Sequence, residues 1–538
     1  MVAFPSLEDL FVGTLHDTGS DMWGKYDYSD DNVSSFSKLK NLRVLECDKL
    51  ETMIPPAMLN RMRNLEAVYI GGCKSLINVF PSSIARDLIH LKSLEVSGCE
   101  LLTEIIGPDE QEITDSIVFP DLTRLQLCDL PSLTSFWCYL TGEDNSYKVE
   151  FPNLVDLDLW CEKFSLGAKE LGMDVFTCQR LKRLTLRNCG YSTALALSIF
   201  KSLQQLQSME IYNSTLLEEI VEDVKGDEAS GMDKETLTLP QLKYLRLENL
   251  PNIKSFILNS NYECHMPALT EVKIHKCGIS TLFTFSSLRS LPQLQELEIS
   301  NCALLEEIVE GARGDEASGM DKKTITLFKL RSVILSYLPN LKNFIHSANY
   351  KCHMPALTKV AIYDCGFSTL FTLSDLRKLH QLAEIDVSDC RLLESIADDV
   401  GNDETSFKDD TIITFSQLTK IHLQSLPSLK CFSSSSSYTF SMPKLNDFSM
   451  QSCPQMEYFT FLKASTPMAR VSVNWKVWKH IPDLNDYIRK RCERRSRLSG
   501  SVGKSRCSAQ ELEKESERVE EEQPEEDTKE NDQLLIQQ

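Results

Sequence analysis

The residue types of this sequence that could carry chemistry are cysteine and histidine, and their spacing does not indicate catalysis. The chain has 18 cysteines and 9 histidines. The histidines do not cluster with carboxylates or thiols at a known catalytic spacing, and no GxSxG, HExxH or GxGxxG motif occurs. The nearest approach to a phosphate-binding loop, LSGSVGKS from Leu498, has leucine where the first glycine must stand. We therefore expect no catalytic residue, no cofactor and no enzymatic activity.

Half of the cysteines recur at one position of a repeated unit, which favours a structural role over metal binding. No CxxC pair occurs, and these cysteines lie about one repeat apart, unlike zinc ligands. A small residue with a weak donor suits a position where the chain turns inward after a strand, and we expect it to reach a neighbouring carbonyl. The pairs Cys264-His265 and Cys352-His353 have metal-ligand residue types but are copies of one loop, so we expect no metal site there either. The repeated cysteines are Cys47, Cys73, Cys99, Cys189, Cys277, Cys302, Cys365, Cys390 and Cys453.

The unit around these cysteines has the pattern LxxLxLxxCxxL, with isoleucine or valine often replacing leucine. A second form has Leu-Pro in the cysteine position, as at Leu130-Pro131. The LxL alternation predicts a strand with one face directed inward. The central apolar residues of about 16 such strands, with a partial further one near Val473, are Val12, Val44, Ile70, Val96, Leu127, Leu159, Leu186, Ile211, Leu247, Ile274, Ile299, Leu335, Ile362, Val387, Leu423 and Met450.

A longer repeat is superimposed on the short one. The segment that begins GDEASGMDK at Gly226 returns 88 residues later at Gly314, and MPALT from Met266 returns at Met354. Units that recur at a fixed period stack into a solenoid. We therefore predict an α/β solenoid, a curved leucine-rich-repeat horseshoe with a parallel β-sheet on its concave face. Short helices, expected over 82–91 and 286–297, and loops should cover its convex face.

This organisation predicts three segments. Residues 1–473 should form the leucine-rich-repeat solenoid of about 16 repeats, with the 88-residue super-repeat from about 159 to 450. Residues 474–488 should cap its end, with Trp475, Trp478 and Ile481 covering the last open core. Residues 489–538, first basic and then acidic, are poor in apolar residues and should be disordered.

The net charge of −21 argues against binding to nucleic acid or to anionic membranes. No run of about 18 apolar residues indicates a membrane span, and the N-terminus does not resemble a signal peptide. Cysteines in a chain of this length favour a reduced, intracellular and cytoplasmic protein, and the basic run from Arg489 leaves a nuclear location as an alternative.

The acidic excess has two interpretations, solvated loops or an edge that meets a basic partner. It lies in residues 104–115, 217–235, 306–323 and 394–410.

Comparison of the two 88-residue copies separates buried from outward positions. The inward positions are identical or exchange one aliphatic residue for another, whereas outward ones change, as from Arg246 to Ile334. Exposure alone does not explain this, because the loop DEASGMDK is identical in both copies. Either the outward positions drift because they tolerate change, or the concave face varies because it binds a protein. The contact candidates are Tyr69, Trp160, Arg187, Tyr212, Arg246, His275, Tyr337 and Tyr363.

The phrases FPSLEDL from Phe4, FPDLTRLQLCDLPSLTSF from Phe119 and FPNLVDLDL from Phe151 resemble one family over about residues 1–480. It is the leucine-rich-repeat region of plant intracellular coiled-coil NLR disease-resistance proteins. The resemblance implies a ligand-sensing and autoinhibitory region of an immune receptor, acting in the defence response. Its implied partner is a pathogen effector, a guarded host protein or the receptor's own signalling module.

The coiled-coil and nucleotide-binding modules of that family do not occur in this sequence, which opens inside a repeat at FPSLEDL. We therefore expect a fragment, a truncated product or a stand-alone repeat protein. The alternative function is a scaffold or a substrate receptor, such as a leucine-rich-repeat subunit of a ubiquitin ligase. An F-box-like helical module would support that alternative, and none is visible at the N-terminus.

Overall fold

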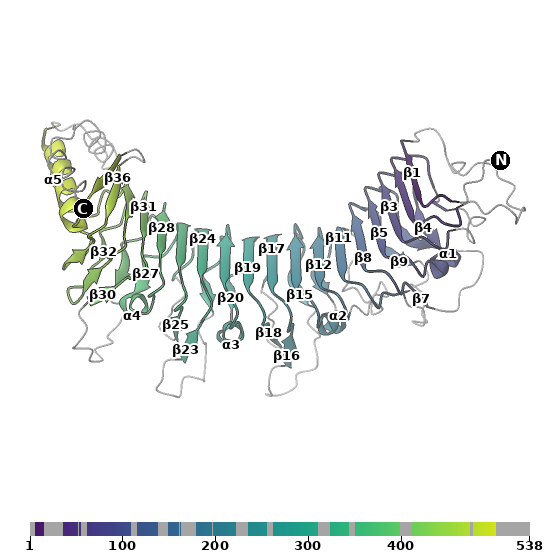
Figure 1. Cartoon of the computed structure of the whole chain (residues 1–538), viewed down its shortest axis with the longest axis horizontal. Helices are drawn as coiled ribbons and strands as arrows, with labels where there is room; N and C mark the ends of the chain where they lie inside the picture. The colour runs from purple at the N-terminus through teal and green to yellow at the C-terminus, as the bar shows by residue number, and fades with distance from the viewer. Residues whose placement is uncertain are drawn as a thin grey trace, which may run out of the picture. The chain divides into compact units, whose positions relative to one another are not determined.

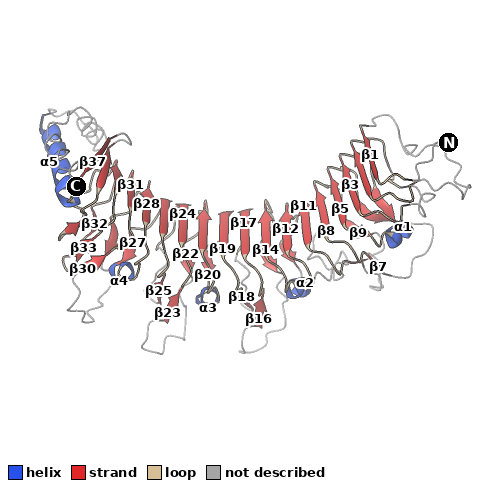
Figure 2. Ribbon diagram, viewed as in Figure 1, coloured by secondary structure: helices blue, strands red, loops and turns tan. Residues whose placement is uncertain are grey.

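A computed structural model of the chain divides it into two compact units, Met1–Ser280 (unit 1) and Thr281–Gln538 (unit 2). Each unit is built of short parallel strands, and Figure 2 shows how strongly strands (red) dominate over helices (blue). The residues that the structure describes are 6–14, 36–51, 53–54, 62–108, 116–137, 149–160, 162, 179–195, 197–221, 235–254, 262–309, 323–343, 350–398, 412–473 and 477–501.

Unit 1 contributes one parallel strand from each repeat to its main sheet, and Figure 1 shows these strands side by side. Adjacent strands pair in register, so that Leu42 of one strand lies between Leu10 and Val68 of its neighbours. Leu42 and Val68 are buried, as the alternation predicts. The strands are β1 (Asp9–Gly13), β2 (Asn41–Leu45), β3 (Ala67–Gly71), β5 (Ser93–Ser97), β8 (Arg124–Cys128), β11 (Asp156–Trp160), β12 (Arg183–Arg187), β14 (Ser208–Tyr212), β17 (Tyr244–Leu250) and β19 (Glu271–Cys277).

The return path of each repeat in unit 1 forms a second layer of very short strands and two short helices. The strands pair in small parallel sheets of two or three. The members of this layer are β4 (Asn78–Pro81), β6 (Glu104–Gly107), β9 (Ser135–Trp137), β7 (Ile117–Val118), β10 (Val149–Glu150), β13 (Thr193–Leu195), β15 (Glu219–Val221), β16 (Glu235–Thr238), β18 (Tyr262–His265), α1 (Ser82–Asp87) and α2 (Leu197–Ser202).

Unit 2 repeats this plan. Its main sheet ends with one antiparallel strand, β37, which pairs with β36. Its main-sheet strands are β21 (Glu296–Ser300), β24 (Ser332–Leu338), β26 (Lys359–Cys365), β28 (Glu384–Ser388), β31 (Lys420–Gln424), β34 (Asp447–Gln451), β36 (Arg470–Val473) and β37 (Val477–His480). Its other elements are β20 (Thr281–Phe283), β22 (Glu307–Val309), β23 (Lys323–Thr326), β25 (Tyr350–His353), β27 (Thr369–Thr372), β29 (Ser395–Asp398), β32 (Cys431–Ser433), β30 (Ile412–Thr414), β33 (Thr439–Ser441), β35 (Ala464–Ser465), α3 (Phe285–Arg289), α4 (Leu373–Leu376) and α5 (Leu484–Ser501).

Each central apolar residue that the sequence predicts, from Val12 to Met450, lies in a strand of the main sheet. From Val44 to Met450 these side chains are also buried. The prediction of a parallel leucine-rich-repeat solenoid is therefore confirmed. Its core lies between the main sheet and the second layer of each unit. Phenylalanines fill part of it: the rings of Phe119 and Phe151 stack at 5.6 Å, and Phe136 meets Phe151 edge-on at 5.3 Å.

One residue past most main-sheet strands takes a positive φ, which redirects the chain toward the core. The residue is often asparagine, aspartate or glycine, as at Asn188 (52°), Asn213 (51°) and Gly72 (65°). These residue types enter the left-handed region at the lowest cost. In one pair of adjacent repeats they also link the turns, because the Asn249 side chain donates to the Asn213 side-chain oxygen at 2.9 Å.

The helices are shorter than the sequence predicts. The helix expected over 82–91 ends at Asp87, and the one expected over 286–297 is the single turn Phe285–Arg289. Pro292 explains the second difference, because proline disfavours helical backbone in the residue before it. The main-sheet strand β21 then begins at Glu296.

The end of unit 2 corrects the prediction of disorder from residue 489, because α5 continues through the basic run to Ser501. Leu484 and Ile488, one helical turn apart, are fully buried and anchor the helix. Asp483 caps its start by accepting from the backbone N–H of Asn485 at 2.9 Å. The charged composition of this segment suggested disorder, although Leu484 and Ile488 are enough to anchor a helix on the core. Trp475 and residues 502–538 lie outside the described residues.

The register predicts the effect of placing a charge in the core. Leu297 is 2% exposed and pairs with Val333 on the next strand. We expect Leu297→Asp to lower the free energy of unfolding by at least about 3 kcal/mol, because its carboxylate has no partner in this core. Thermal unfolding followed by circular dichroism measures this, with Glu296→Ala as the exposed control on the same strand. An unchanged midpoint in Leu297→Asp would contradict the register.

Candidate functional site

The repeated cysteines act as a turn device. The thiol of Cys302 donates to the carbonyl of Ser300 at 3.4 Å, and that of Cys390 donates to Ser388 at 3.3 Å. The predicted contact with a neighbouring carbonyl is therefore confirmed. Adjacent repeats are linked as well, since the backbone N–H of Cys365 donates to the Cys390 sulfur at 3.4 Å. Burial raises the pKa of the Cys390 thiol to about 11, so it stays protonated at neutral pH and is a poor nucleophile.

In each of the two Cys-His pairs, strand alternation places the cysteine and the histidine on opposite faces of the strand. Cys264 and Cys352 point into the core and are buried, whereas His265 and His353 lie on the opposite face of the same strands. Burial raises the pKa of the Cys264 and Cys352 thiols to about 12. Lys378 donates to Nε2 of His353 at 2.8 Å. Neither pair can therefore direct both side chains at one ion, which agrees with a structural role.

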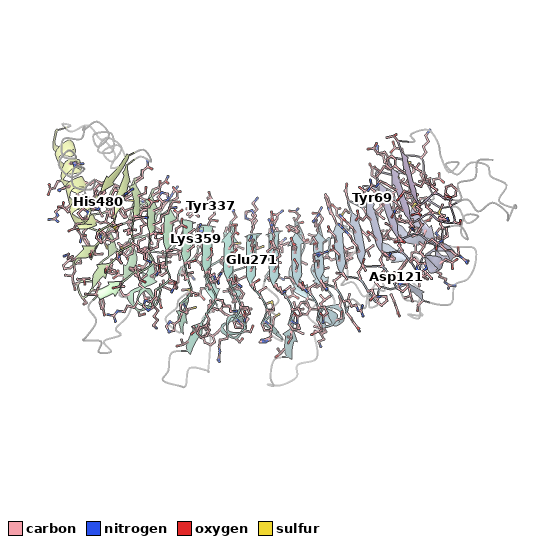
Figure 3. The ribbon with its side chains drawn as sticks, in the orientation of Figure 1. Tyr69, Asp121, Glu271, Tyr337, Lys359 and His480 are labelled. Atoms are coloured by element: carbon pink, nitrogen blue, oxygen red, sulfur yellow. The ribbon has the colours of Figure 1, made fainter. Side chains whose placement is uncertain are left out.

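The candidate contact residues are carried by the face of the main sheet that points away from the core. In each strand the residues directly before and directly after the central apolar residue point to this face, and so does the residue three positions before it. In β11, where Leu159 is central, these residues are Asp158, Trp160 and Asp156. We call these residues the outward sheet face of each unit. Figure 3 shows Tyr69 on its strand in unit 1 and Tyr337 at the end of β24 in unit 2.

Four candidates of unit 1 share one register row. Trp160 pairs with Arg187, and Arg187 pairs with Tyr212. Glu248 follows in that row and pairs with His275. Arg246 lies in the neighbouring row, on the same strand as Glu248. The parallel register therefore gathers residues that are far apart in the sequence.

Tyr212 is the centre of this group. The guanidinium carbons of Arg187 and Arg246 lie 5.5 and 5.4 Å from its ring centroid. Its hydroxyl donates to Glu210, and burial together with this bond raises the pKa of Tyr212. Arg246 also pairs with Glu248 at 2.8 Å. Two arginines, one aromatic ring and their carboxylate partners thus form a polar and rigid cluster.

Asp158 and Asn188 position Arg187 and Trp160 at the edge of this cluster. Arg187 forms an ion pair with Asp158 at 3.5 Å, and burial raises the pKa of that carboxyl group. With the Asn188 amide turned to satisfy its neighbours, its oxygen accepts from Nε1 of Trp160 at 2.7 Å. Trp160 remains 36% exposed. The indole is therefore oriented by the protein while its face stays accessible.

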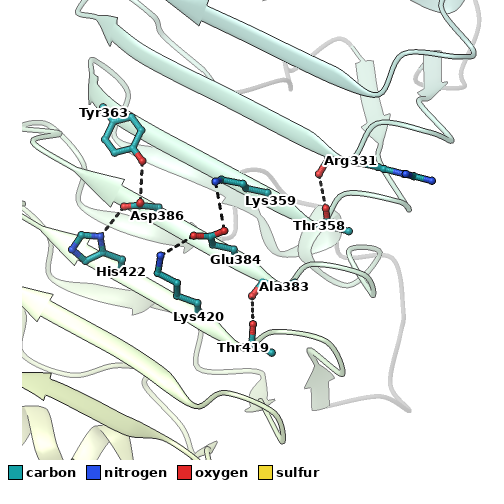
Figure 4. A network of polar contacts seen from close by, with 10 residues as sticks. All are labelled: Arg331, Thr358, Lys359, Tyr363, Ala383, Glu384, Asp386, Thr419, Lys420 and His422. Carbon is teal, nitrogen blue, oxygen red and sulfur yellow. Dashed lines mark hydrogen bonds and ion pairs between the residues drawn. The ribbon is translucent and has the colours of Figure 1, made fainter. Parts of the chain in front are cut away.

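Tyr363 belongs to a second polar network, on the outward sheet face of unit 2 (Figure 4). Its hydroxyl donates to one oxygen of Asp386 at 2.9 Å, and Nδ1 of His422 lies 2.9 Å from the other. Burial alone would raise the pKa of Asp386, but the hydrogen bonds from His422 and Tyr363 lower it. One row away, Glu384 contacts Lys420 at 2.8 Å and Lys359 at 3.6 Å.

Two candidates lie apart from these clusters. Tyr69 lies between Arg43 and Glu95 in register, and the Arg43 guanidinium carbon is 5.2 Å from its ring centroid. Tyr337 lies within β24, where the register pairs Ser336 and Leu338 with the next strand but not Tyr337. It occupies the turn position just past Ser336, with a φ of 55° and 54% exposure.

Sequence comparison missed several residues that the register brings to this face. They occupy the position just before the central apolar residue, a signal that the alternation itself contains. These residues are Phe11, Arg43, Glu210 and His422. The acidic segments 104–115, 217–235, 306–323 and 394–410 lie mostly outside the described residues, so both interpretations of them stay predictions.

The face presents aromatic and arginine side chains on rigid strands, the types that dominate binding energy at protein interfaces. No helix within the described ranges combines the length and the apolar character needed to cross a lipid bilayer.

The comparison with protein-family models agrees with this fold. The model for the leucine-rich repeats of plant disease resistance protein RPS2-like sequences matches residues 20–80, 56–100, 68–165, 165–303, 261–391 and 348–466. No protein with a curated description matches. Among solved structures, a leucine-rich-repeat protein of Leptospira interrogans is 15% identical, with 71% of this chain and 84% of that one covered and a TM-score of 0.35. A chain of the Toll–Spatzle complex of Drosophila is 14% identical, with 82% and 58% covered and a TM-score of 0.33.

The Asp386 network predicts a pH-dependent stability. Because its pKa in the folded state is lowered, Asp386 stabilises the fold above its ordinary pKa of about 3.8. This contribution is lost as the pH falls through the lowered value. Asp386→Asn should lower the unfolding midpoint at pH 7, and the difference from wild type should shrink below about pH 4. Thermal melts across this range test it, with the exposed Asp389→Asn as control; a difference independent of pH would contradict it.

The backbone of Tyr337 predicts a second effect. Asparagine tolerates positive φ better than tyrosine, so Tyr337→Asn should raise the free energy of unfolding by about 0.5–1 kcal/mol. The preceding copy offers the reciprocal control, since Asn249 holds the same turn at a φ of 56°. Asn249→Tyr should lower stability, which denaturant titration measures. Opposite signs would contradict the assigned cost of this turn.

Proposed function

Because this chain belongs to the RPS2-like plant disease resistance proteins through their leucine-rich repeats, we propose that it recognises a protein in plant defence. Repeats of this family are binding modules and are typically non-catalytic. In this proposal the chain is the ligand-sensing and autoinhibitory repeat region of an immune receptor, or a truncated form of one. Its partner is a pathogen effector, a guarded host protein or the receptor's own signalling module, met inside the cell.

The observation that carries the proposal is the aromatic and arginine cluster around Tyr212 on the outward sheet face. Its side chains stand on adjacent strands, and their ion pairs and ring contacts hold them in place before any partner arrives. Preorganised anchors of these types lose little side-chain entropy on binding. A protein surface that complements them can therefore gain affinity from few contacts.

The charge of the face supports a protein partner over nucleic acid. A surface that binds phosphate backbones needs unpaired cations, and the chain as a whole carries a net charge of −21. Unlike the cations of a phosphate-binding surface, Arg187 and Arg246 in the Tyr212 cluster each have a carboxylate partner. A mosaic of paired charges around aromatic rings suits a partner with an equally mixed surface.

The proposal predicts where binding is lost. Proximity labelling with the full chain in plant cells would capture the partner, and its affinity for purified variants would then be measured. Tyr212→Ala and Arg246→Ala should each weaken binding at least tenfold, about 1.4 kcal/mol, while the unfolding midpoint stays near that of wild type.

Two exposed apolar residues away from this face provide matched controls. Leu304 is 58% exposed and Phe328 is 67% exposed. Leu304→Ala and Phe328→Ala should leave the affinity unchanged. If these variants lose the partner while the Tyr212 and Arg246 variants keep it, binding occurs elsewhere and the proposed face is wrong.

A further inference from the structure

A hollow on the outward sheet face of unit 1 lies over β1, β2, β3 and β5. Its volume is about 510 Å³, and Phe11, Arg43, Tyr69 and Glu95 are among its lining residues. Phe11, Arg43 and Tyr69 are successive members of one register row, so Arg43 lies between two aromatic residues on adjacent strands, and its guanidinium contacts the Tyr69 ring. We call this the Arg43 hollow.

Arg43 differs from the other basic residues of the face. In the part of the chain that the structure describes, each of the other arginines and lysines on the outward sheet face of unit 1 has a carboxylate partner. These pairs are Arg124–Glu95, Arg183–Asp156, Arg187–Asp158, Arg246–Glu248 and Lys273–Glu271. Among the described residues Arg43 makes no ion pair, and its guanidinium contacts the Tyr69 ring instead. Within the described ranges, its N–H donors therefore have no carboxylate acceptor.

The carboxylates that line the hollow, those of Asp9 and Glu95, form no ion pair with Arg43. Asp9 accepts from the side chain of Asn41 at 2.5 Å, and Glu95 is engaged by Arg124 at 3.3 Å. The ring of Tyr69 supports one face of the guanidinium, which leaves its edge to form parallel hydrogen bonds to a planar anion. Carboxylate and phosphate groups both match this edge in geometry.

We propose that the Arg43 hollow binds one carboxylate side chain of an extended protein segment, whose apolar neighbours pack on Phe11 and Tyr69. The inference rests on the proposed function and names the chemistry of the partner at this part of the face. Phe11, at 63% exposure, supplies the apolar contact. A phosphate group fits less well, because its second charge would meet Asp9 and Glu95, and the described residues that line the hollow offer no second unpaired cation. A single carboxylate matches the single arginine.

The test uses the full chain and labelled synthetic peptides that differ at one position. In each, a central glutamate, glutamine or phosphoserine is flanked by leucine and phenylalanine in a glycine–serine background, and fluorescence anisotropy gives the affinity. Wild type should bind the glutamate peptide at least tenfold more tightly than the glutamine peptide and more tightly than the phosphoserine peptide. Arg43→Gln should abolish the preference for glutamate, and Arg43→Lys should reduce it.

Lys273→Gln is the matched control, because Lys273 also contacts a tyrosine ring, that of Tyr244, but has its own carboxylate in Glu271. It should keep the preference, and all variants should melt near the wild-type midpoint. Equal affinity of wild type for glutamate and glutamine, tighter binding of phosphoserine, or a preference that survives Arg43→Gln would overturn the inference. Loss of the captured partner in Tyr212→Ala, together with any of these results, would leave the proposed function standing and remove only this inference.

Discussion

Each repeat of this chain is stable only because the inward residues of its strand are buried against the strands before and after it. Val44 and Val333 illustrate this, since each is almost fully buried between neighbouring repeats of its own unit. The parallel hydrogen-bond register keeps these side chains aligned and fixes the outward positions at the same time. The outward sheet face is thus a consequence of core packing, because the residues that alternate with the buried ones must point away from the core.

Much of the fold can be predicted from the sequence because the inward positions are constrained by burial. The LxL alternation locates the main-sheet strands, and the cysteines mark the inward turn. Local chemistry limits the rest. Pro292 shortens α3, and α5 is held by Leu484 and Ile488 within a charged run whose composition suggests disorder. The positive φ of the turn residue could not be predicted from residue type, because aspartate, asparagine and glycine often occupy the position but residues such as Tyr337 occupy it too.

The candidate site is predictable in position but not in its contacts. Alternation places Tyr212 and Tyr363 on the outward sheet face. It does not say that two arginines would meet the ring of Tyr212, or that Asp386 would join Tyr363 to His422. Those contacts depend on side-chain length and rotamer across neighbouring strands. The charge balance of the face follows from them, because pairing decides which cations remain available to a partner.

The most direct test of the central claim, that the outward sheet face recognises a protein, is hydroxyl-radical footprinting of the full chain with and without its captured partner. Oxidation of exposed side chains is read by mass spectrometry. The account predicts protection at Trp160 and Tyr212 when the partner is bound, and unchanged oxidation at Phe328 and Leu392, which are exposed away from this face. Protection of Phe328 or Leu392 with full reactivity at Trp160 and Tyr212 would contradict it.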